Sequence, residues 1–154
     1  MVTEDMGHPI DILLVEDNRT DILLAREGLR ETKMINRLHV VETGTDAMDF
    51  LHKQGKYANA PRPDLILLDL NLPKKDGREV LQEIKDDADL KIIPVVILTT
   101  SQEERDIIKA YGLHANCYIT KPVNFEKFKE IVQAIETFWF SVVRLPPHDD
   151  ADEG

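Results

Sequence analysis

The stretch from Asp64 to Pro73 constrains the fold of this chain more than any other part of the sequence. Residues 65–68 are all apolar, which is typical of a strand covered on both faces of a sheet. Asp69 follows at once, so we expect it at the carboxyl end of a central strand, where open α/β sheets bind ligands and react. A plainer interpretation is that Asp69 only begins a turn and accepts a hydrogen bond from the backbone N–H two residues on.

Apolar runs alternate with segments of helical periodicity along the rest of the chain. The predicted strands are 10–15, 38–41, a third that ends at Asp69, 94–98 and 116–119, and the predicted helices are 18–33, 46–54, 77–86, 102–111 and 124–140. Because a helix of ten residues or so joins consecutive strands, the strands should pair in parallel through right-handed crossovers. Residues 55–63 contain two prolines and a glycine and are predicted to be a loop without a regular element. The sequence therefore indicates one α/β domain over residues 9–140.

Composition narrows the classes of protein that this chain can belong to. The net charge of −10 argues against nonspecific nucleic-acid binding, which depends on Lys and Arg neutralising phosphates. No run of eighteen apolar residues is present, and the first nine residues include Glu4 and Asp5, so we expect neither a membrane span nor a signal peptide, and a cytoplasmic location. The single cysteine, Cys117, excludes an internal disulfide and a multi-cysteine zinc site.

Residues 141–154 are predicted to form an acidic, disordered tail. This segment contains two prolines, and four of its last six residues are acidic, namely Asp149, Asp150, Asp152 and Glu153. A dense run of like charge with few apolar residues is typical of solvated chain.

Polar side chains end four of the predicted strands, and a parallel sheet brings these ends to one edge. They are Glu16 and Asp17 after the first strand, Asp69 after the third, Thr99 after the fourth and Lys121 after the fifth. Clustered carboxylates suit a hard divalent cation such as Mg²⁺, and the backbone carbonyl of Asn71 could add a ligand. Lysine and threonine can contact a phosphoryl oxygen. The hypothesis is in-line phosphoryl transfer onto Asp69, followed by slow attack of water.

Each of these residues also has a plainer interpretation. Glu16 and Asp17 could cap the first helix, because carboxylates are common at helix starts. Thr99 could be an ordinary hydroxyl at a strand end, and Lys121 could be a surface lysine. Together, these readings require four independent coincidences at one edge of the sheet.

The same residues resemble the receiver domain of two-component response regulators over about residues 9–140. The resemblance rests on the acidic pair, on Asp69 within LLDLNLPKKDG, on Thr99, and on Lys121-Pro122, with 30 residues from Asp69 to Thr99 and 22 from Thr99 to Lys121. It implies a flavodoxin-like (βα)5 three-layer sandwich with sheet order 2-1-3-4-5. It also implies Asp69 as the phosphoacceptor. The implied Mg²⁺ ligands are Glu16, Asp17, Asp69 and the Asn71 carbonyl, with Thr99 and Lys121 reading the phosphoryl group.

The resemblance further implies a switch and a set of partners. Phosphorylation would draw Thr99 inward and turn Tyr118 with it. The partner that supplies the phosphoryl group would be a sensor histidine kinase, and the output would be protein binding or phosphate relay. The long 55–63 connection, the Pro-Lys-Lys-Asp-Gly77 segment and the Phe138-Trp139-Phe140 cluster look like single-domain regulators of bacterial phytochromes, which form homodimers through their fourth and fifth helices. The kinase and the downstream protein are not named by the sequence.

Three other functions compete with this interpretation. A haloacid-dehalogenase-like phosphatase also forms an aspartyl phosphate, but it needs an acidic residue where this chain has Asn71. A flavodoxin-like nucleotide binder needs a glycine-rich loop where Glu16 and Asp17 would repel phosphate. A phosphorylation-independent scaffold with the receiver fold is the third, and the complete set of strand-end residues argues against it. We expect a signalling domain rather than a turnover enzyme, with at most self-phosphotransfer and slow autodephosphorylation.

Overall fold

The fold is taken from a computed structural model of the whole chain. The structure describes residues 9–31, 35–72, 75–99 and 117–120, together with the helical residues 126, 130 and 133. The predicted helix 102–111 and most of the predicted helix 124–140 lie outside the described residues, as does the segment 141–154.

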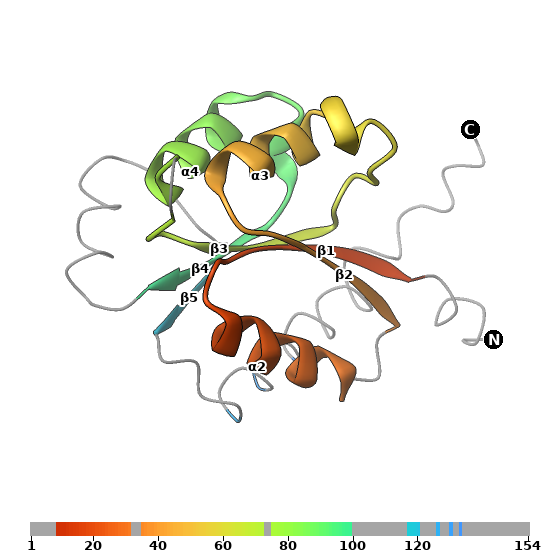
Figure 1. Cartoon of the computed structure of the whole chain (residues 1–154), viewed down its shortest axis with the longest axis vertical. Coiled ribbons are helices and arrows are strands. Elements are labelled where there is room, and N and C mark those ends of the chain that lie inside the picture. The colour runs from red at the N-terminus through yellow and green to blue at the C-terminus, as the bar shows by residue number, and fades with distance from the viewer. Residues whose placement is uncertain are drawn as a thin grey trace.

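Five parallel strands form a single sheet at the centre of the molecule (Figure 1). They are β1 (Ile10–Val15), β2 (Asn36–Val41), β3 (Leu65–Asp69), β4 (Val95–Thr99) and β5 (Cys117–Thr120). The strand order is β2-β1-β3-β4-β5, so the predicted flavodoxin-like order 2-1-3-4-5 is confirmed. All four strand pairings are parallel, which brings every carboxyl end to the same edge.

Helices cover both faces of this sheet, as Figure 1 shows. The helix α2 (Arg19–Arg30) lies on one face, and α3 (Gly44–Leu51) and α4 (Gly77–Asp86) lie on the other. Two short 3-10 turns, η1 (Gly55–Tyr57) and η2 (Leu90–Ile92), complete the described helical elements.

Residues 12–15 of β1 and 65–68 of β3 are all apolar because each face of the sheet has its own core. In β1, Leu13 belongs to the core under α3 and α4, and Leu14 belongs to the core under α2. In β3 the same alternation places Leu68 in the first core and Leu67 in the second. Such strands read as continuous apolar runs, as predicted from residues 65–68.

The boundaries of some elements differ from the prediction. The strand predicted at 38–41 begins at Asn36, because Ile10 pairs with Asn36 at the start of the ladder. The helix predicted at 46–54 spans Gly44–Leu51 and is capped by Thr43, whose hydroxyl accepts a hydrogen bond from the Asp46 N–H at 3.0 Å. The prediction that 55–63 contains no regular element was wrong, since Gly55–Tyr57 form a 3-10 turn.

Two features stabilise that turn, namely a glycine with a positive φ and a tyrosine that packs against the core. Gly55 has a φ of 59°, a backbone conformation that costs glycine little. Tyr57 contacts the core, with its ring centroid 5.5 Å from that of Phe50. Within the described residues, no helix is long and apolar enough to cross a membrane.

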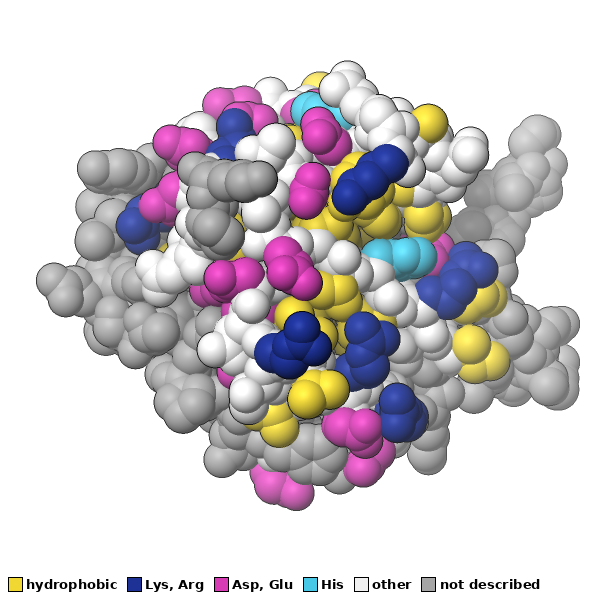
Figure 2. Space-filling view, viewed as in Figure 1, with side chains coloured by type: hydrophobic (Ala, Val, Ile, Leu, Met, Phe, Trp, Pro, Cys, Tyr) yellow, Lys and Arg dark blue, Asp and Glu magenta, His cyan; other side chains and the backbone are white. Residues whose placement is uncertain are grey.

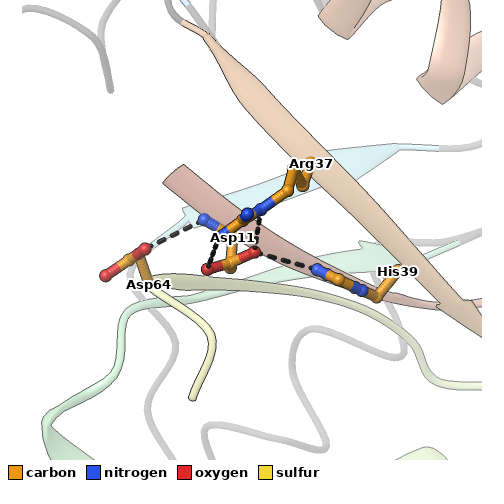
Figure 3. A network of polar contacts seen from close by, with 4 residues as sticks. All are labelled: Asp11, Arg37, His39 and Asp64. Carbon is orange, nitrogen blue, oxygen red and sulfur yellow. Dashed lines mark hydrogen bonds and ion pairs between the residues drawn. The ribbon is translucent and has the colours of Figure 1, made fainter. Parts of the chain in front are cut away.

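A polar network joins the amino ends of three strands (Figure 3). The Asp11 carboxylate accepts hydrogen bonds from Arg37 Nε at 2.9 Å and Arg37 Nη2 at 3.1 Å, and contacts His39 Nε2 at 2.9 Å. The backbone N–H of Asp11 donates to Asp64 Oδ2 at 2.9 Å. Burial raises the pKa of Asp11, but the hydrogen bonds and positive charge of Arg37 and His39 outweigh it and hold the pKa below its usual 3.8. The network fixes the register of β1, β2 and the start of β3.

Candidate functional site

Three carboxylates gather at the carboxyl edge of the sheet. Carboxylate oxygens of Glu16, Asp17 and Asp69 lie within 4.8 Å of one another. The strand register produces this meeting, because Val15 pairs with Leu68 and the next residues are Glu16 and Asp69. Glu16 and Asp69 are 0% and 1% exposed, whereas Asp17 is exposed. The prediction that these three residues come together is confirmed.

The acidic pair does not cap α2. The N-cap is Asn18, whose Oδ1 accepts a hydrogen bond from the Asp21 N–H at 2.9 Å. The backbone N–H of Asn18 donates in turn to Glu16 Oε2 at 3.2 Å, which orients the Glu16 side chain. The interpretation of Glu16 and Asp17 as helix caps is therefore wrong, and the sequence signal that was missed is the asparagine that follows them.

Asp69 does accept the turn hydrogen bond that the plainer interpretation expects. The Asn71 N–H donates to Asp69 Oδ1 at 3.1 Å. The turn and the acidic cluster are compatible, because this hydrogen bond fixes the carboxylate at the strand end where Glu16 and Asp17 meet it. The two interpretations of Asp69 describe one geometry.

Gly77 lets α4 begin directly behind Asp69. Its backbone N–H donates to the Leu70 carbonyl at 3.1 Å. A Cβ added at Gly77 would lie 2.6 Å from the Leu70 Cα and would overlap the Asp69 carbonyl oxygen. No side chain fits there without moving the strand end, so Gly77 positions the turn that holds Asp69. The sequence motif that contains Gly77 did not predict this role.

The remaining predicted site residues are only partly described. Asp69 pairs with Leu98 in the ladder, so Thr99 stands one residue further along β4. Thr99 pairs with Thr120 of β5, directly before Lys121 in the chain. The backbone therefore brings these strand ends to the edge that carries the acidic cluster. The side chains of Thr99 and Tyr118, and Lys121 itself, lie outside what the structure describes.

The cluster has the donor chemistry of a divalent-cation site. Mg²⁺ and similar hard cations take carboxylate oxygens at roughly 2.0–2.6 Å while keeping water. Three carboxylates within 4.8 Å of one another repel unless a cation or a proton offsets the charge. The exposure of Asp17 leaves one side of the cluster open to solvent and to an incoming group.

Comparison with known proteins decides the family. The family model described as the response regulator receiver domain matches residues 12–133. The chain belongs to the response regulator receiver domain family. The chain is 52% identical over 145 residues to response regulator Rcp1 of Synechocystis sp. (strain ATCC 27184 / PCC 6803 / Kazusa), with 94% of this chain and 99% of Rcp1 covered.

Two solved structures resemble this receiver domain in both sequence and fold. The phosphorylated cyanobacterial phytochrome response regulator RcpA is 56% identical with a TM-score of 0.74, covering 86% of this chain and 95% of RcpA. The Mn²⁺-bound form of response regulator Rcp1 is 55% identical with a TM-score of 0.75, covering 90% of this chain and 99% of Rcp1. The receiver domain is therefore a signalling domain of two-component systems, a family in which phosphorylation on aspartate is typical.

Proposed function

We propose that this receiver domain accepts a phosphoryl group on Asp69 from a sensor histidine kinase, with Mg²⁺ bound beside it. The observation that carries the proposal is the meeting of Glu16, Asp17 and Asp69 within 4.8 Å at the carboxyl edge of the sheet. Among the described residues, no other group of three or more His, Cys, Asp or Glu side chains meets in this way.

The proposed Mg²⁺ ligands are Glu16, Asp17, Asp69 and the backbone carbonyl of Asn71. The three carboxylates supply hard oxygen donors, and the exposed Asp17 leaves room for water on the cation. When bound, the cation lowers the repulsion between the Asp69 carboxylate and an incoming phosphoryl group. The Mn²⁺-bound form of the relative Rcp1 supports a divalent cation, and the oxygen-only donor set suits hard cations, Mg²⁺ among them.

In the proposed transfer, an Asp69 carboxylate oxygen attacks the phosphorus of a phosphohistidine on the kinase. A P–O bond forms as the P–N bond breaks, and the imidazole leaves with the electron pair and takes up a proton. The Asn71 N–H donates to Oδ1 of Asp69 at 3.1 Å, which orients the carboxylate at the strand end. Thr99 and Lys121 are proposed to donate to the phosphoryl oxygens.

The signal is proposed to leave the site through a conformational switch. Thr99 would move toward the phosphoryl group and Tyr118 on β5 would turn with it. A phosphoryl mimic, beryllofluoride with Mg²⁺, should therefore change the amide chemical shifts at Tyr118 and in residues 102–111. Unchanged shifts there would count against the switch. Turnover is limited to self-phosphotransfer from small phosphodonors and slow hydrolysis by water.

The proposed kinase is a bacterial phytochrome. Support comes from the relatives, since RcpA is a cyanobacterial phytochrome response regulator and 56% identical to this chain. Phosphotransfer from such a kinase requires a cytoplasmic location, where ATP is available to the kinase.

We also propose a homodimer through the fourth and fifth predicted helices, residues 102–111 and 124–140, with Phe138, Trp139 and Phe140 at the contact. A downstream protein is the proposed target. Sedimentation with and without beryllofluoride tests the dimer, and a monomer in both conditions would remove it.

The proposed domain boundaries are residues 9–140 for the receiver domain and 141–154 for an acidic tail. The family model, which matches residues 12–133, supports the first range. Limited proteolysis should cleave after residue 140 and leave a fragment that still binds Mg²⁺. Cleavage within 9–140 at the same rate would contradict these boundaries.

Phosphotransfer from purified kinases tests the function. A phosphorylated bacterial phytochrome kinase should transfer label to the chain faster than an unrelated sensor kinase, and only with Mg²⁺ present. Asp69→Asn should abolish the transfer, whereas the control Asp49→Asn on α3 should keep it. Label that persists at full yield in Asp69→Asn would refute the phosphoacceptor assignment. Absence of transfer from every kinase, with an intact fold, would favour the alternative, a phosphorylation-independent scaffold.

A further inference from the structure

A groove runs between α2 and the edge strand β2, on the molecular face that Figure 2 shows. It consists of two hollows of about 390 and 320 Å³. Leu29 and Leu38 line the first hollow, Ile22 and Val40 line the second, and Arg26 lines both. The two hollows share Arg26, and α2 and β2 both supply apolar side chains to their floor.

Exposed apolar side chains widen this floor. Leu23 is 56% exposed and lines the second hollow, and Ile35 is 49% exposed and lines the first. Ile92, on the far face of the sheet with η2, is the third large hydrophobic residue exposed among the described residues. Exposed apolar side chains gathered in a polar rim are typical of docking surfaces. Two of the three lie in this one groove.

Three arginines line the groove, although the chain is acidic overall. Arg19, Arg26 and Arg30 are spaced by seven and four residues, so they share one face of α2, and all three are exposed. In Figure 2, Lys and Arg side chains flank hydrophobic side chains over this part of the surface. The net charge of the whole chain is −10, which makes this concentration of arginines unusual within it.

The two hollows differ in charge. The second is lined by Asp17 and Glu42 as well as by Arg19 and Arg26, so its charges balance. The lining of the first contains Arg26 and Arg30 and no carboxylate. Arg30 also pairs with Glu27 at 3.0 Å across the exposed face of α2, which offsets part of its charge. The first hollow is therefore the end of the groove that attracts an anionic partner.

We propose that this groove binds the acidic segment 145–153 of the same chain. The segment begins with Leu145-Pro146-Pro147 and continues with Asp149, Asp150, Asp152 and Glu153, which matches an apolar floor followed by an arginine rim. Nine residues lead from Phe140, at the end of the predicted helix 124–140, to Asp149. An extended chain of that length spans roughly 30 Å, and a domain of this size is roughly 40 Å across. The segment can therefore reach the groove from any helix end that lies within roughly 30 Å of it.

Chemical shifts of backbone amides in the full chain test the contact. Neutralising the segment with Asp149→Asn, Asp150→Asn, Asp152→Asn and Glu153→Gln should shift the amides of residues 22–40 and leave those of β3 and β4 in place. Raising the salt concentration in the unaltered chain should shift the same amides, because salt screens exposed charges. Amides of residues 22–40 that respond to neither change would overturn the proposal.

A synthetic peptide of residues 145–153 identifies the residues that bind. Titrated into the neutralised chain, it should shift the same amides, and Arg26→Glu or Arg30→Glu should weaken its binding by up to about fivefold each, as expected for an exposed ion pair. The matched control is Lys91→Glu, an equal charge change on η2 at the other face of the sheet, which should bind as before. Equal weakening by Lys91→Glu would show nonspecific attraction and overturn the assignment. Shifts in the unaltered chain that vanish on dilution would point to a second copy instead.

Discussion

The acidic cluster makes a sharp prediction about stability, because repulsion within it opposes folding when no cation is bound. Replacing Asp69 with asparagine keeps the size of the side chain and removes one charge from a buried pair with Glu16, whose side chain is 0% exposed. Two unit charges 4.8 Å apart, the largest separation within the cluster, repel by about 3.5 kcal/mol at an effective dielectric constant of 20.

A smaller opposing effect reduces this gain. The hydrogen bond from the Asn71 N–H to Asp69 Oδ1, at 3.1 Å, becomes a bond to a neutral oxygen and loses about 1 kcal/mol. We therefore expect Asp69→Asn to raise the free energy of unfolding by about 2.5 kcal/mol in EDTA. In a chain of 154 residues this corresponds to a rise of about 5–10 °C in Tm.

Thermal melts in EDTA and in Mg²⁺ measure both parts of this prediction. Mg²⁺ at ten times its Kd should stabilise the unaltered chain by about 1.4 kcal/mol. The same Mg²⁺ should stabilise Asp69→Asn less, so the difference between the two proteins narrows. The control Asp49→Asn, on α3 and outside the cluster, should stay within about 0.5 kcal/mol in both conditions. An Asp69→Asn protein that is less stable in EDTA, or that gains as much from Mg²⁺, would refute the electrostatic account.

Three further predictions concern the supports of the site and the sheet. Gly77→Ala should lower the free energy of unfolding by about 1–3 kcal/mol and weaken Mg²⁺ binding, because the alanine Cβ would lie 2.6 Å from Leu70 Cα. An unchanged midpoint in a urea melt would contradict the close contact. Asn18→Ala should lower the free energy of unfolding by about 0.5–2 kcal/mol, and Asn18→Asp by much less, since only alanine loses the hydrogen bond that caps the Asp21 N–H. Equal losses of stability in urea melts would count against this capping role. Asp11→Asn should destabilise the chain well above pH 3.8. The difference in free energy of unfolding between the two proteins should fade as the pH drops through the lowered pKa of Asp11, since the stabilising charge of Asp11 is lost there. Urea melts over a pH series test this, and a difference that stays constant with pH would exclude the charge as its cause.

The sequence predicted the elements that depend on apolar periodicity. The apolar run at 65–68 predicted a strand covered on both faces, and its residues are buried in the two cores. The helix predicted at 77–86 has the bounds observed for α4. The meeting of Glu16, Asp17 and Asp69 also followed, because parallel strands bring their carboxyl ends to one edge. The strands and helices depend on patterns that are local in the chain, and the meeting of the carboxylates depends on the parallel pairing that those patterns predict.

The features that the sequence did not predict depend on contacts between distant segments. Asp11 lies in the first predicted strand with no role assigned to it, and only the register of β1 with β2 brings Arg37 and His39 to it. The role of Gly77 arises from the close approach of α4 to Leu70, which no spacing in the sequence specifies. The 3-10 turn at Gly55–Tyr57 depends on a contact between Tyr57 and Phe50.

Mapping the phosphorylated residue tests the central claim most directly. The chain is incubated with acetyl phosphate and Mg²⁺, treated with borohydride to convert an aspartyl phosphate to homoserine, and digested for mass spectrometry. We predict conversion at Asp69 alone, and none when EDTA removes the divalent cation. Conversion at another carboxylate, or equal conversion at Asp69 in EDTA, would contradict the account of Asp69 as a cation-dependent phosphoacceptor.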